Sequence, residues 1–443
     1  MIRTCSGSST VGIPTGSSRT GTTPSASSAI STTRRCARDR RSRRWPSLDA
    51  PVTMRIANPR ALSYLVRAPG ELGISRAFVA GDLEVRGDMY TTLAAIGAAP
   101  VSVRSLLKTL RSIGAPIVRA ALTPAPRPRQ EAKLRGRRHS KARDAAAIAH
   151  HYDVGNRFYE MVLGPSMAYT CACYPREDAT LEEAQAHKFD LACRKIGLQP
   201  GMRLLDVGCG WGGMVMHAAR EYGVTALGVT LSRAQAEWAA KAIAEAGLAD
   251  RAEVRHLDYR DAPDVPGGYD AISSIGLTEH IGRAQLPAYF ATLYRKLKPG
   301  GRLLNHAIMR TTTTQRAAAG GFINRYVFPD GELHGVGHVI AVMQNSGLEV
   351  RHEENLREHY AKTLRAWCEN LDANWEACVA DAGAQVARVW RLYMAGSRLG
   401  FDQHRLELHQ VLGVKPERDG ASHMPLRPDW EPPSHATRRR RPA

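Results

Sequence analysis

Strand-like and helix-like patterns alternate along the middle of the chain, from Arg203 to Ile308. Short apolar runs, typical of buried strands, are separated by segments in which apolar residues recur at helical spacing. Five runs are interpreted as strands, at residues 203–206, 225–229, 253–257, 271–275 and 302–308, and the first helix is expected at 214–222. This alternation predicts an α/β fold with a doubly wound, mostly parallel sheet and helices on both faces.

The patterns on either side of this sheet predict a smaller domain and a helical insertion. Residues 51–126 are expected to form a small α+β domain, with strand, turn and helix at 51–65, a helix leading into a strand at 72–85, and a helix at 106–122. A helical insertion at 364–402 precedes a closing strand at 406–414, and such insertions often cover an active site. The main domain is therefore expected to span residues 145–415.

The chain has 443 residues and a formal net charge of +19, most of which is concentrated in three segments. Residues 1–50 carry +7, a linker at 127–144 carries +6 and Arg438 to Arg441 carry +4, which leaves the rest nearly neutral at +2. The segments 1–50 and 416–443 are predicted to be disordered. Basic segments suit a polyanion, either an anionic membrane surface or a nucleic acid, but solvated tails without a specific partner are an equally good interpretation.

Cysteine usage and hydropathy limit where the protein is expected to act. The eight cysteines form no C-x-x-C pair, which predicts free thiols, no metal site and a reducing, cytoplasmic environment. No apolar run reaches the length of about eighteen residues that a membrane-spanning helix needs. No apolar stretch follows the charges at the amino terminus, so no secretory signal is expected.

The stretch Leu-Leu-Asp-Val-Gly-Cys-Gly-Trp-Gly, residues 204–212, places a glycine turn between the first strand and the first helix. Such a turn lets a ligand lie against bare backbone at the carboxyl end of a parallel sheet. Gly208, Gly210 and Gly213 also fit the dinucleotide pattern G-x-G-x-x-G, which is a weak signal alone. The turn is thus compatible with a nicotinamide cofactor, with S-adenosylmethionine (SAM), or with a strand–turn–helix unit that binds nothing.

The ends of the next two strands favour SAM. A nicotinamide enzyme is expected to carry Asp or Glu after the second strand, whereas this chain has Thr230 there and Gln235 in the following helix. Asp258 and Tyr259 follow the third strand, where an acid and an aromatic ring would suit an adenine. Polar groups at three strand ends on one rim of a sheet predict a ligand site.

Further stretches lie where the substrate of a SAM enzyme is expected. They are His-Tyr-Asp-Val-Gly-Asn (151–156), Tyr-Thr-Cys-Ala (169–172), Glu-His-Ile-Gly (279–282), Asn-His-Ala-Ile (305–308) and His-Tyr-Ala-Lys-Thr-Leu (359–364). Together with the glycine turn and Thr-Leu-Ser at 230–232, they closely resemble the cyclopropane-fatty-acid synthase family, which includes the mycolic acid cyclopropane synthases. The resemblance covers residues 52–415. It implies a class I SAM-methyltransferase fold with a helical cap, and a small domain like the lipid-binding domain of phospholipid-acting members.

The resemblance implies two sets of site residues and no metal. The SAM set has Asp206 near the methionine amino group, Thr230 and Gln235 at the ribose, and Asp258 with Tyr259 beside the adenine. Its remaining members are Tyr169, Thr170, Gly208, Gly210 and Gly212. The second, catalytic set holds a bicarbonate ion beside the reacting carbons, and its members are Cys171, Glu279, His306, Tyr360 and, through its backbone, Ile308.

The activity that the resemblance implies is transfer of a methylene group from SAM to the double bond of unsaturated acyl chains of phospholipids. Methyl transfer would leave a carbocation, and bicarbonate would remove a proton so that a cyclopropane ring closes. The alternatives are a methyl- or methylene-branching reaction on the same chains, and a small-molecule SAM-dependent methyltransferase. A nucleic-acid-binding function is disfavoured, because the nearly neutral body offers no basic face with interleaved aromatic residues.

An enzyme that acts on lipid chains without a spanning helix must be held at the bilayer in another way. The basic linker, with Arg135, Arg137, Arg138 and Lys141, is the candidate for binding an anionic membrane surface. The sequence thus predicts a cytoplasmic protein that is peripheral at the inner membrane face. It leaves acyl position, head-group preference and oligomeric state open, a dimer included.

Overall fold

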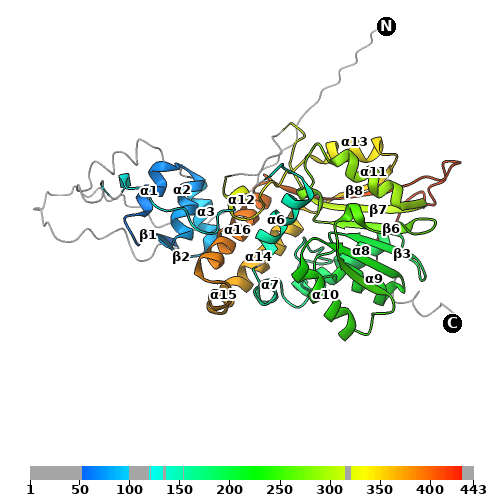
Figure 1. Cartoon of the computed structure of the whole chain (residues 1–443), viewed down its shortest axis with the longest axis horizontal. Coiled ribbons are helices and arrows are strands. Elements are labelled where there is room, and N and C mark those ends of the chain that lie inside the picture. Colours follow the sequence, from blue (N-terminus) through cyan, green and yellow to red (C-terminus); the bar gives the residue numbers. More distant parts are fainter. Residues whose placement is uncertain are drawn as a thin grey trace, which may run out of the picture. The chain divides into compact units, whose positions relative to one another are not determined.

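A computed structural model describes residues 52–98, 119, 121–132, 136–152, 154–314 and 321–431 (Figure 1). The predictions for residues 1–50, for most of the helix expected at 106–122, and for residues 432–443 lie outside the described residues. Within the described part, the chain forms a two-stranded sheet near its start and a seven-stranded sheet in the main domain.

The larger sheet has the strand order β5-β4-β3-β6-β7-β9-β8 among the described residues. Its parallel strands are β3 (Arg203–Val207), β4 (Thr225–Thr230), β5 (Ala252–His256), β6 (Tyr269–Ile275) and β7 (Leu297–Met309). Two antiparallel strands, β9 (Glu407–Val414) and β8 (Glu349–Asn355), complete one edge. The predicted α/β class with a mostly parallel sheet is confirmed. The apolar pattern does not predict β8, because Val350 is the one aliphatic residue in that strand.

Helices cover both faces of this sheet, as the alternating pattern predicts (Figure 1). One face packs against α8 (Leu181–Ile196), α9 (Gly213–Tyr222) and α10 (Arg233–Glu245), and the other against α11 (Leu286–Lys296) and α13 (Val336–Asn345). Leu204 and Leu205 of β3 belong to these two cores in turn, because successive side chains of a strand point to opposite faces. Burial on both faces explains why Leu204, Leu205 and Val207 of β3 are all apolar.

Helix α8 has ends that its sequence dictates, and it carries two buried lysines that matter below. Thr180 accepts the N–H of Glu183 at 3.2 Å, and the Glu183 carboxylate accepts the N–H of Thr180 at 2.8 Å. Gly197 ends the helix in the left-handed conformation, with φ of 69°. Between these ends, Lys188 and Lys195 are both 0% exposed.

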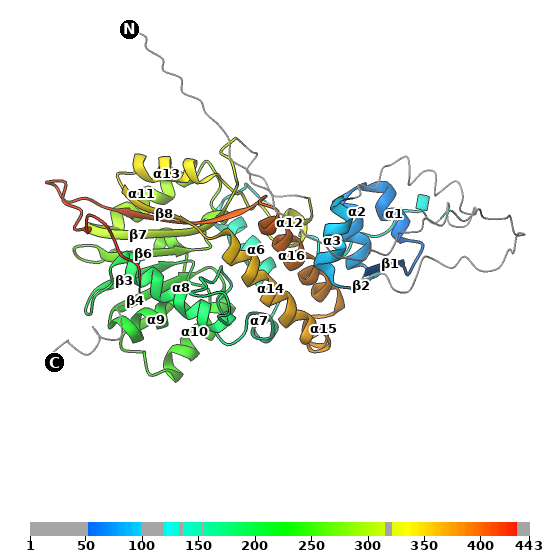
Figure 2. The same cartoon turned by 180° about the vertical axis from the view of Figure 1, so that it is seen from behind.

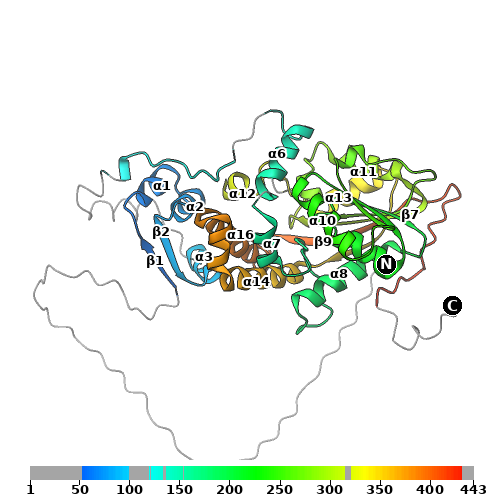
Figure 3. The same cartoon turned by 60° about the horizontal axis from the view of Figure 1, so that its bottom comes forward.

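A helical cap lies between β8 and β9 in the sequence. It consists of α14 (Arg357–Ala373), α15 (Trp375–Ala382) and α16 (Ala384–Asp402). Figures 2 and 3 show α14 and α16 side by side, and α7 (Asn156–Leu163) packs against α14 and α15. The insertion expected at 364–402 is therefore present but begins earlier, so that Tyr360 lies in the first turn of α14. Among the described residues, no helix combines the length and the apolar character needed to cross a bilayer.

The segment that is expected to form a small domain contains β1 (Val52–Ile56), α1 (Ala61–Arg67), α2 (Glu71–Val79), β2 (Leu83–Gly87) and α3 (Met89–Ala98). The two strands pair antiparallel, and the elements expected over residues 51–85 are present. Helices α2 and α3 pack against α16. Arg76 of α2 forms a largely buried ion pair with Glu131 at 2.6 Å, and the hydroxyl of Tyr326 in α12 (Gly321–Tyr326) donates to the same carboxylate at 3.0 Å.

Residues 416–431, part of the tail that the sequence predicts to be disordered, pack along the edge of the sheet. Arg302 of β7 donates to the carbonyl oxygen of His423 at 3.1 Å, and Arg351 of β8 donates to Ser422 Oγ at 3.1 Å. The ring of Trp430 lies 5.4 Å from that of His352. The segment has no helix or strand, but these contacts to β7 and β8 distinguish it from a disordered tail.

Candidate active site

The glycine turn after β3 forms the bare backbone surface that the sequence predicts. Gly208, Gly210 and Gly212 have φ values of 74°, 55° and 79°, which other residues rarely adopt. The N–H groups of Gly208 and Cys209 both donate to the carbonyl oxygen of Val229, at 2.9 and 3.1 Å, and so fix the turn against β4. A Cβ added to Gly210 would meet nothing within 4 Å, so open space lies beside the turn. A ligand can therefore approach the backbone there.

Asp206 carries a buried carboxyl group directly before this turn. The residue is 2% exposed, and Ser273 Oγ donates to its Oδ1 at 2.6 Å. Burial raises the pKa of Asp206 to about 6, although the hydrogen bond from Ser273 and the charge of Lys188 lower it. A carboxyl group held near its point of ionisation responds strongly to a cation placed beside it.

The polar groups at the end of β4 form one hydrogen-bonded unit. Thr230 Oγ1 donates to Gln235 Oε1 at 2.7 Å and accepts the N–H of Ser232 at 3.2 Å. Ser232 caps α10 by accepting the N–H of Gln235 at 3.3 Å. The structure thus brings the predicted ribose pair together, next to the strand that carries the glycine turn.

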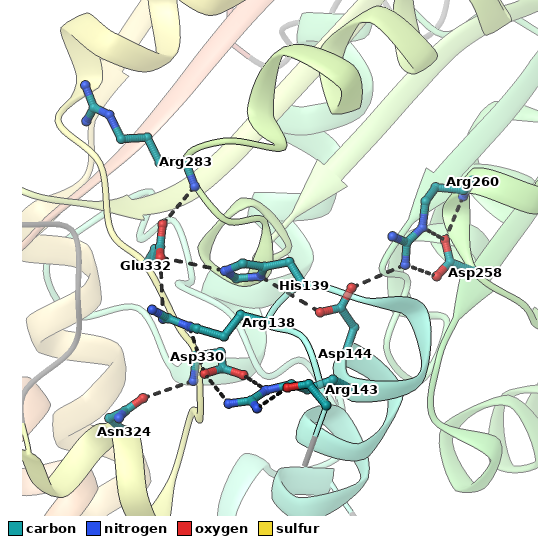
Figure 4. A network of polar contacts seen from close by, with 11 residues as sticks. Arg138, His139, Arg143, Asp144, Asp258, Arg260, Arg283, Asn324, Asp330 and Glu332 are labelled. Carbon is teal, nitrogen blue, oxygen red and sulfur yellow. Dashed lines mark hydrogen bonds and ion pairs between the residues drawn. The ribbon is translucent and has the colours of Figure 1, made fainter. Parts of the chain in front are cut away.

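Asp258, predicted to lie beside the adenine, is already engaged by a neighbouring side chain. Its carboxylate accepts from Arg260 Nε at 2.7 Å and from Nη2 at 2.5 Å. Burial would raise the pKa of Asp258, but Arg260 lowers it below its ordinary value. Arg260 also contacts Asp144 of α6 (Lys141–Tyr152) at 3.3 Å (Figure 4). The ring of Tyr259 packs against Tyr289, with centroids 5.0 Å apart.

Tyr169 and Thr170 precede α8 and touch residues that the sequence did not single out. The hydroxyl of Tyr169 donates to that of Tyr393 at 3.0 Å, and Thr170 Oγ1 accepts from Lys188 Nζ at 2.8 Å. Burial lowers the pKa of Lys188 to about 8. Nothing in the sequence marks Lys188, because a lysine on an amphipathic helix is normally solvent-exposed.

Glu279 occupies the second predicted cluster. Its Oε1 accepts the backbone N–H of Ile308 at 2.7 Å, so part of the backbone that was expected to bind bicarbonate is hydrogen-bonded to Glu279. Its Oε2 is buried and has no hydrogen-bond partner among the described residues. Burial raises the pKa of Glu279 to about 7, against the hydrogen bond from Ile308.

Tyr360 and Cys171 lie near Glu279. The Tyr360 ring packs against Phe401 at 4.7 Å between centroids. Burial raises the pKa of Tyr360, and the charges of Tyr393, Cys171 and Glu279 raise it further. Tyr360 therefore lies within electrostatic range of both Cys171 and Glu279.

His306 is fully buried on β7 and belongs to the same region. Its Nδ1 lies 3.0 Å from Gln410 Nε2, and its Nε2 has no partner among the described residues. Burial lowers the pKa of His306 well below its ordinary value, and the charges of Lys188 and Lys195 lower it further. Lys188 also lowers the pKa of Cys171, against burial, and it donates to Thr170, the neighbour of Cys171 in the chain.

Aromatic rings surround Tyr169 in a cluster that the sequence does not reveal. Its ring lies 5.8 Å from Tyr159, 5.5 Å from Trp390 and 5.4 Å from Trp367, measured between centroids. We call these four residues the aromatic wall. Such faces stabilise a neighbouring cation. Tyr159, Trp367 and Trp390 escape prediction because aromatic residues at helical spacing are also typical of an ordinary core.

Comparison with known proteins agrees with this arrangement. Residues 139–411 match the family described as mycolic acid cyclopropane synthetase. A probable fatty acid methyltransferase of Mycobacterium tuberculosis is 52% identical over 87% of this chain and 92% of that protein. A probable fatty acid methyltransferase of Pseudomonas putida is 39% identical over 84% and 90%. The mycolic acid cyclopropane synthase CmaA1, solved with SAH and CTAB, matches with a TM-score of 0.58 and 33% identity, over 61% of this chain and 97% of that one. The chain therefore belongs to the mycolic acid cyclopropane synthetase family, has the class I fold of that family and is a SAM-dependent methyltransferase.

Proposed function

We propose that the enzyme transfers a methylene group from SAM to the double bond of an unsaturated phospholipid acyl chain and so forms a cyclopropane ring. The observation that carries this proposal is the grouping of Glu279 with the buried side chains of Cys171, His306 and Tyr360, of which Tyr360 lies 6.0 Å from Trp367 of the aromatic wall, measured between ring centroids. An isolated alkene is a poor nucleophile, so it reacts with a sulfonium methyl group only in a dry and oriented pocket. The names of the two fatty acid methyltransferases support a fatty acyl substrate.

The SAM end of the site would be formed by the ends of three adjacent parallel strands. Asp206 would accept the methionine amino group, and the Thr230–Gln235 unit would bind the ribose hydroxyls. Asp258 and Tyr259 would flank the adenine. Support comes from the topology, because β3, β4 and β5 are neighbours and their carboxyl ends share one rim of the sheet.

The aromatic wall would act after methyl transfer, when the acyl chain carries a positive charge. Tyr159 and Trp390 are nearly inaccessible to solvent, at 0% and 3% exposure, so water would not reach and trap the cation from their side. Their ring faces would stabilise the positive charge. The hydrogen bond between Tyr169 and Tyr393 would hold one face of the wall in place.

The polar cluster fits a small anion. Glu279 Oε2 and His306 Nε2 are buried atoms without a hydrogen-bond partner among the described residues, whereas buried polar atoms are normally paired. The raised pKa values of Cys171 and Tyr360 keep the thiol and the hydroxyl protonated and able to donate at neutral pH. A bicarbonate ion bound by these four side chains would supply the base that removes a proton from the new methyl group.

Glu279 would hold the anion in its protonated form. Its pKa of about 7 leaves a substantial fraction of the carboxyl group neutral near neutral pH, and a neutral carboxyl group donates a hydrogen bond. The N–H of Ile308 binds Oε1, so Oε2 is the oxygen available for the proton. The carboxyl group is thereby oriented before the anion arrives.

A methylene- or methyl-branched product is the second candidate. The observation that favours it is the name fatty acid methyltransferase, which the two relatives carry. Loss of a proton from the new methyl group of this cation closes the ring. If a hydride first shifts from the methylated carbon to the cationic carbon, loss of a proton from the same methyl group leaves a methylene branch, which a separate reductase would convert to a methyl branch. The residues described above would serve both reactions, so the product itself must be identified.

Phospholipid substrates would require the enzyme to work as a peripheral protein at the anionic, inner face of the membrane. Part of the basic linker is already paired with the folded body, however. Arg143 contacts Asp330 at 2.5 Å and Arg138 contacts the same carboxylate at 3.1 Å (Figure 4). Lys141 contacts Asp261 at 2.7 Å. These three charges are compensated locally, which the sequence alone did not indicate.

The exposed arginines of the same linker are then the better candidates for a membrane contact. Arg127, Arg129 and Arg137, which we call the linker arginines, are exposed, and Arg135 lies outside the described residues. Each basic residue near an anionic surface contributes about 1 kcal/mol, and salt screens this attraction. Three such residues would suffice for reversible binding when the small domain also contacts the lipid.

Expression in a host that lacks ring-containing lipids tests the proposed activity. Fatty acid methyl esters from these cells should include chains that are one CH₂ heavier than the host's unsaturated chains. Mild hydrogenation distinguishes the products, because a methylene branch is reduced and a cyclopropane ring resists. Cells that express Glu279→Ala, which lacks a hydrogen-bond donor at this position, are the matched control and should show far less product. If no chain gains a CH₂ although the purified protein binds SAM, the acyl substrate is wrong.

A further inference from the structure

A buried row of polar side chains connects α8 to His306. Gln410 of β9 lies opposite His306 of β7 in the antiparallel register, so the two side chains project to the same face of the sheet. Gln410 Nε2 is 3.0 Å from His306 Nδ1, and Gln410 Oε1 is 2.7 Å from Lys195 Nζ. Lys195 also forms an ion pair with Glu354 of β8. His306, Lys195 and Gln410 are all 0% exposed.

The chemistry of Lys195 determines which way the amide of Gln410 points. An ammonium group has only N–H donors, so the atom that faces it must be the oxygen of the amide. The NH₂ group of Gln410 therefore faces His306. Burial lowers the pKa of Lys195, whereas the ion pair with Glu354 raises it and favours the charged lysine. His352 and Lys195 lower the pKa of Glu354 to about 2, against burial, so the carboxylate stays negative.

The orientation of Gln410 in turn determines which nitrogen of His306 carries the proton. The lowered pKa of His306 means that the ring is neutral and has a single N–H. An NH₂ group can only donate, so Nδ1 must accept and the proton must lie on Nε2. Nε2 is the buried atom without a partner among the described residues. The ring therefore offers one N–H donor at the position where the polar cluster needs one.

We propose that Lys195 and Gln410 are positioning residues that hold His306 in the tautomer with its proton on Nε2. The importance of this tautomer rests on the proposed function, in which Nε2–H donates to the anion bound by Cys171, Glu279 and Tyr360. In the opposite tautomer a lone pair of Nε2 would face that anion and repel it. Neither Lys195 nor Gln410 touches the reacting groups themselves. Their effect on turnover passes through His306.

A purely structural role for the row makes a different prediction. Buried polar groups must be satisfied wherever they occur, and a satisfied row would stabilise the sheet whatever the tautomer of His306. The second N–H of Gln410 points toward Cys173 Sγ at 3.8 Å, a weak contact that provides a comparison. Loss of that contact should affect packing but leave the tautomer unchanged. The tautomer itself is therefore the measurement that separates the two roles.

The tautomer can be read by long-range ¹H–¹⁵N correlation spectroscopy of the full-length protein labelled at its 16 histidines. The signals of His306 are those missing from His306→Gln. In the wild type they should show the nitrogen pattern of a neutral imidazole protonated at Nε2. In Gln410→Glu a carboxylate replaces the NH₂ donor, and the pattern should change to protonation at Nδ1. Cys173→Ala should keep the wild-type pattern.

Kinetics then connect the tautomer to the site. Gln410→Glu and Lys195→Met should lower kcat about ten- to a hundredfold, the range for groups that orient a functional histidine, and leave SAM affinity unchanged. Two results would overturn the inference: a wild-type His306 protonated at Nδ1, or a Gln410→Glu protein that shows the wild-type nitrogen pattern. The first result is obtained from the wild-type protein and does not depend on the folding of a variant. If removal of carbonate leaves wild-type turnover unchanged while the tautomers are as expected, the bicarbonate role is wrong but the inference about Lys195 and Gln410 stands.

Discussion

Asp206 offers a test of the SAM site because its carboxyl group is held near its point of ionisation, with a pKa of about 6. The α-amino group of SAM has an ordinary pKa of about 8 and is positively charged in this range. A cation in contact with Asp206 favours the carboxylate and lowers the pKa of the group in the complex. Protonation of Asp206 therefore competes with SAM binding, and affinity is lost as the pH falls through about 6.

The magnitude follows from this pKa. The apparent Kd is multiplied by one plus the ratio of protonated to charged Asp206, which is about 1.1 at about pH 7 and about 11 at about pH 5. Binding should thus weaken about tenfold between these pH values, or about 1.4 kcal/mol. Isothermal titration calorimetry measures the Kd directly. In two buffers of different ionisation enthalpy it should also show that close to one proton is released on binding at the lower pH.

Two variants isolate the carboxyl group as the cause. Asp206→Asn loses a charge-assisted contact of about 1.5–3 kcal/mol, so its SAM affinity should fall by one to two decades and become independent of pH. Ser273→Ala removes a hydrogen bond that lowers the pKa of Asp206, so its loss of affinity should begin at higher pH. A wild-type affinity that stays constant down to about pH 5, in protein shown to be folded by circular dichroism, would refute the reasoning.

Three further predictions concern other parts of the molecule. Glu279→Ala should bind SAM as the wild type does but turn over about a hundredfold more slowly, because it lacks the hydrogen-bond donor that a glutamine would keep. Removal of carbonate from buffer and headspace should slow the wild type, and an unchanged rate would exclude bicarbonate. Arg76→Met leaves the Glu131 carboxylate without its partner and should lower the free energy of unfolding by about 1–3 kcal/mol, measured in thermal melts. The double variant Arg76→Met with Glu131→Leu should recover much of the lost stability. An Arg76→Met protein as stable as the wild type would contradict this prediction. Replacing the linker arginines by glutamine should reduce co-sedimentation with anionic vesicles and remove its salt dependence. Arg143→Gln is the control and should have neither effect, because Arg143 is already paired with Asp330. Equal binding of the wild type to neutral and anionic vesicles, at low and high salt alike, would point instead to apolar insertion.

The parts of the fold that could be predicted are those in which local sequence carries the information. The apolar run of β3 and the glycines after it report a buried strand and a tight turn within about ten residues. Parallel topology then brings Thr230 and Asp258 to the same rim as Asp206. Strand β8 could not be found in this way, because it is a polar edge strand whose existence depends on pairing with β9, more than fifty residues later.

The candidate site was predicted through its resemblance to a family rather than through periodicity, and its supporting residues were missed. Lys195 is separated by 159 residues from Glu354 and by 215 from Gln410. No local pattern reports such contacts, and a lysine on a helix is normally exposed. The tail shows the same limit, since the contact of Arg302 with His423 depends on a sheet edge that the composition of the tail does not reveal.

The position of β9 has a consequence for the order in which the chain can fold during synthesis. This strand lies between β7 and β8, although both of them precede it in the sequence. Until residues 407–414 have left the ribosome, β7 has an open edge and β8 has no strand to pair with, and open strand edges invite pairing with other chains. Folding of the sheet and burial of His306 should therefore be completed together, by insertion of this late strand. Nascent chains that stop before it are expected to depend on chaperones.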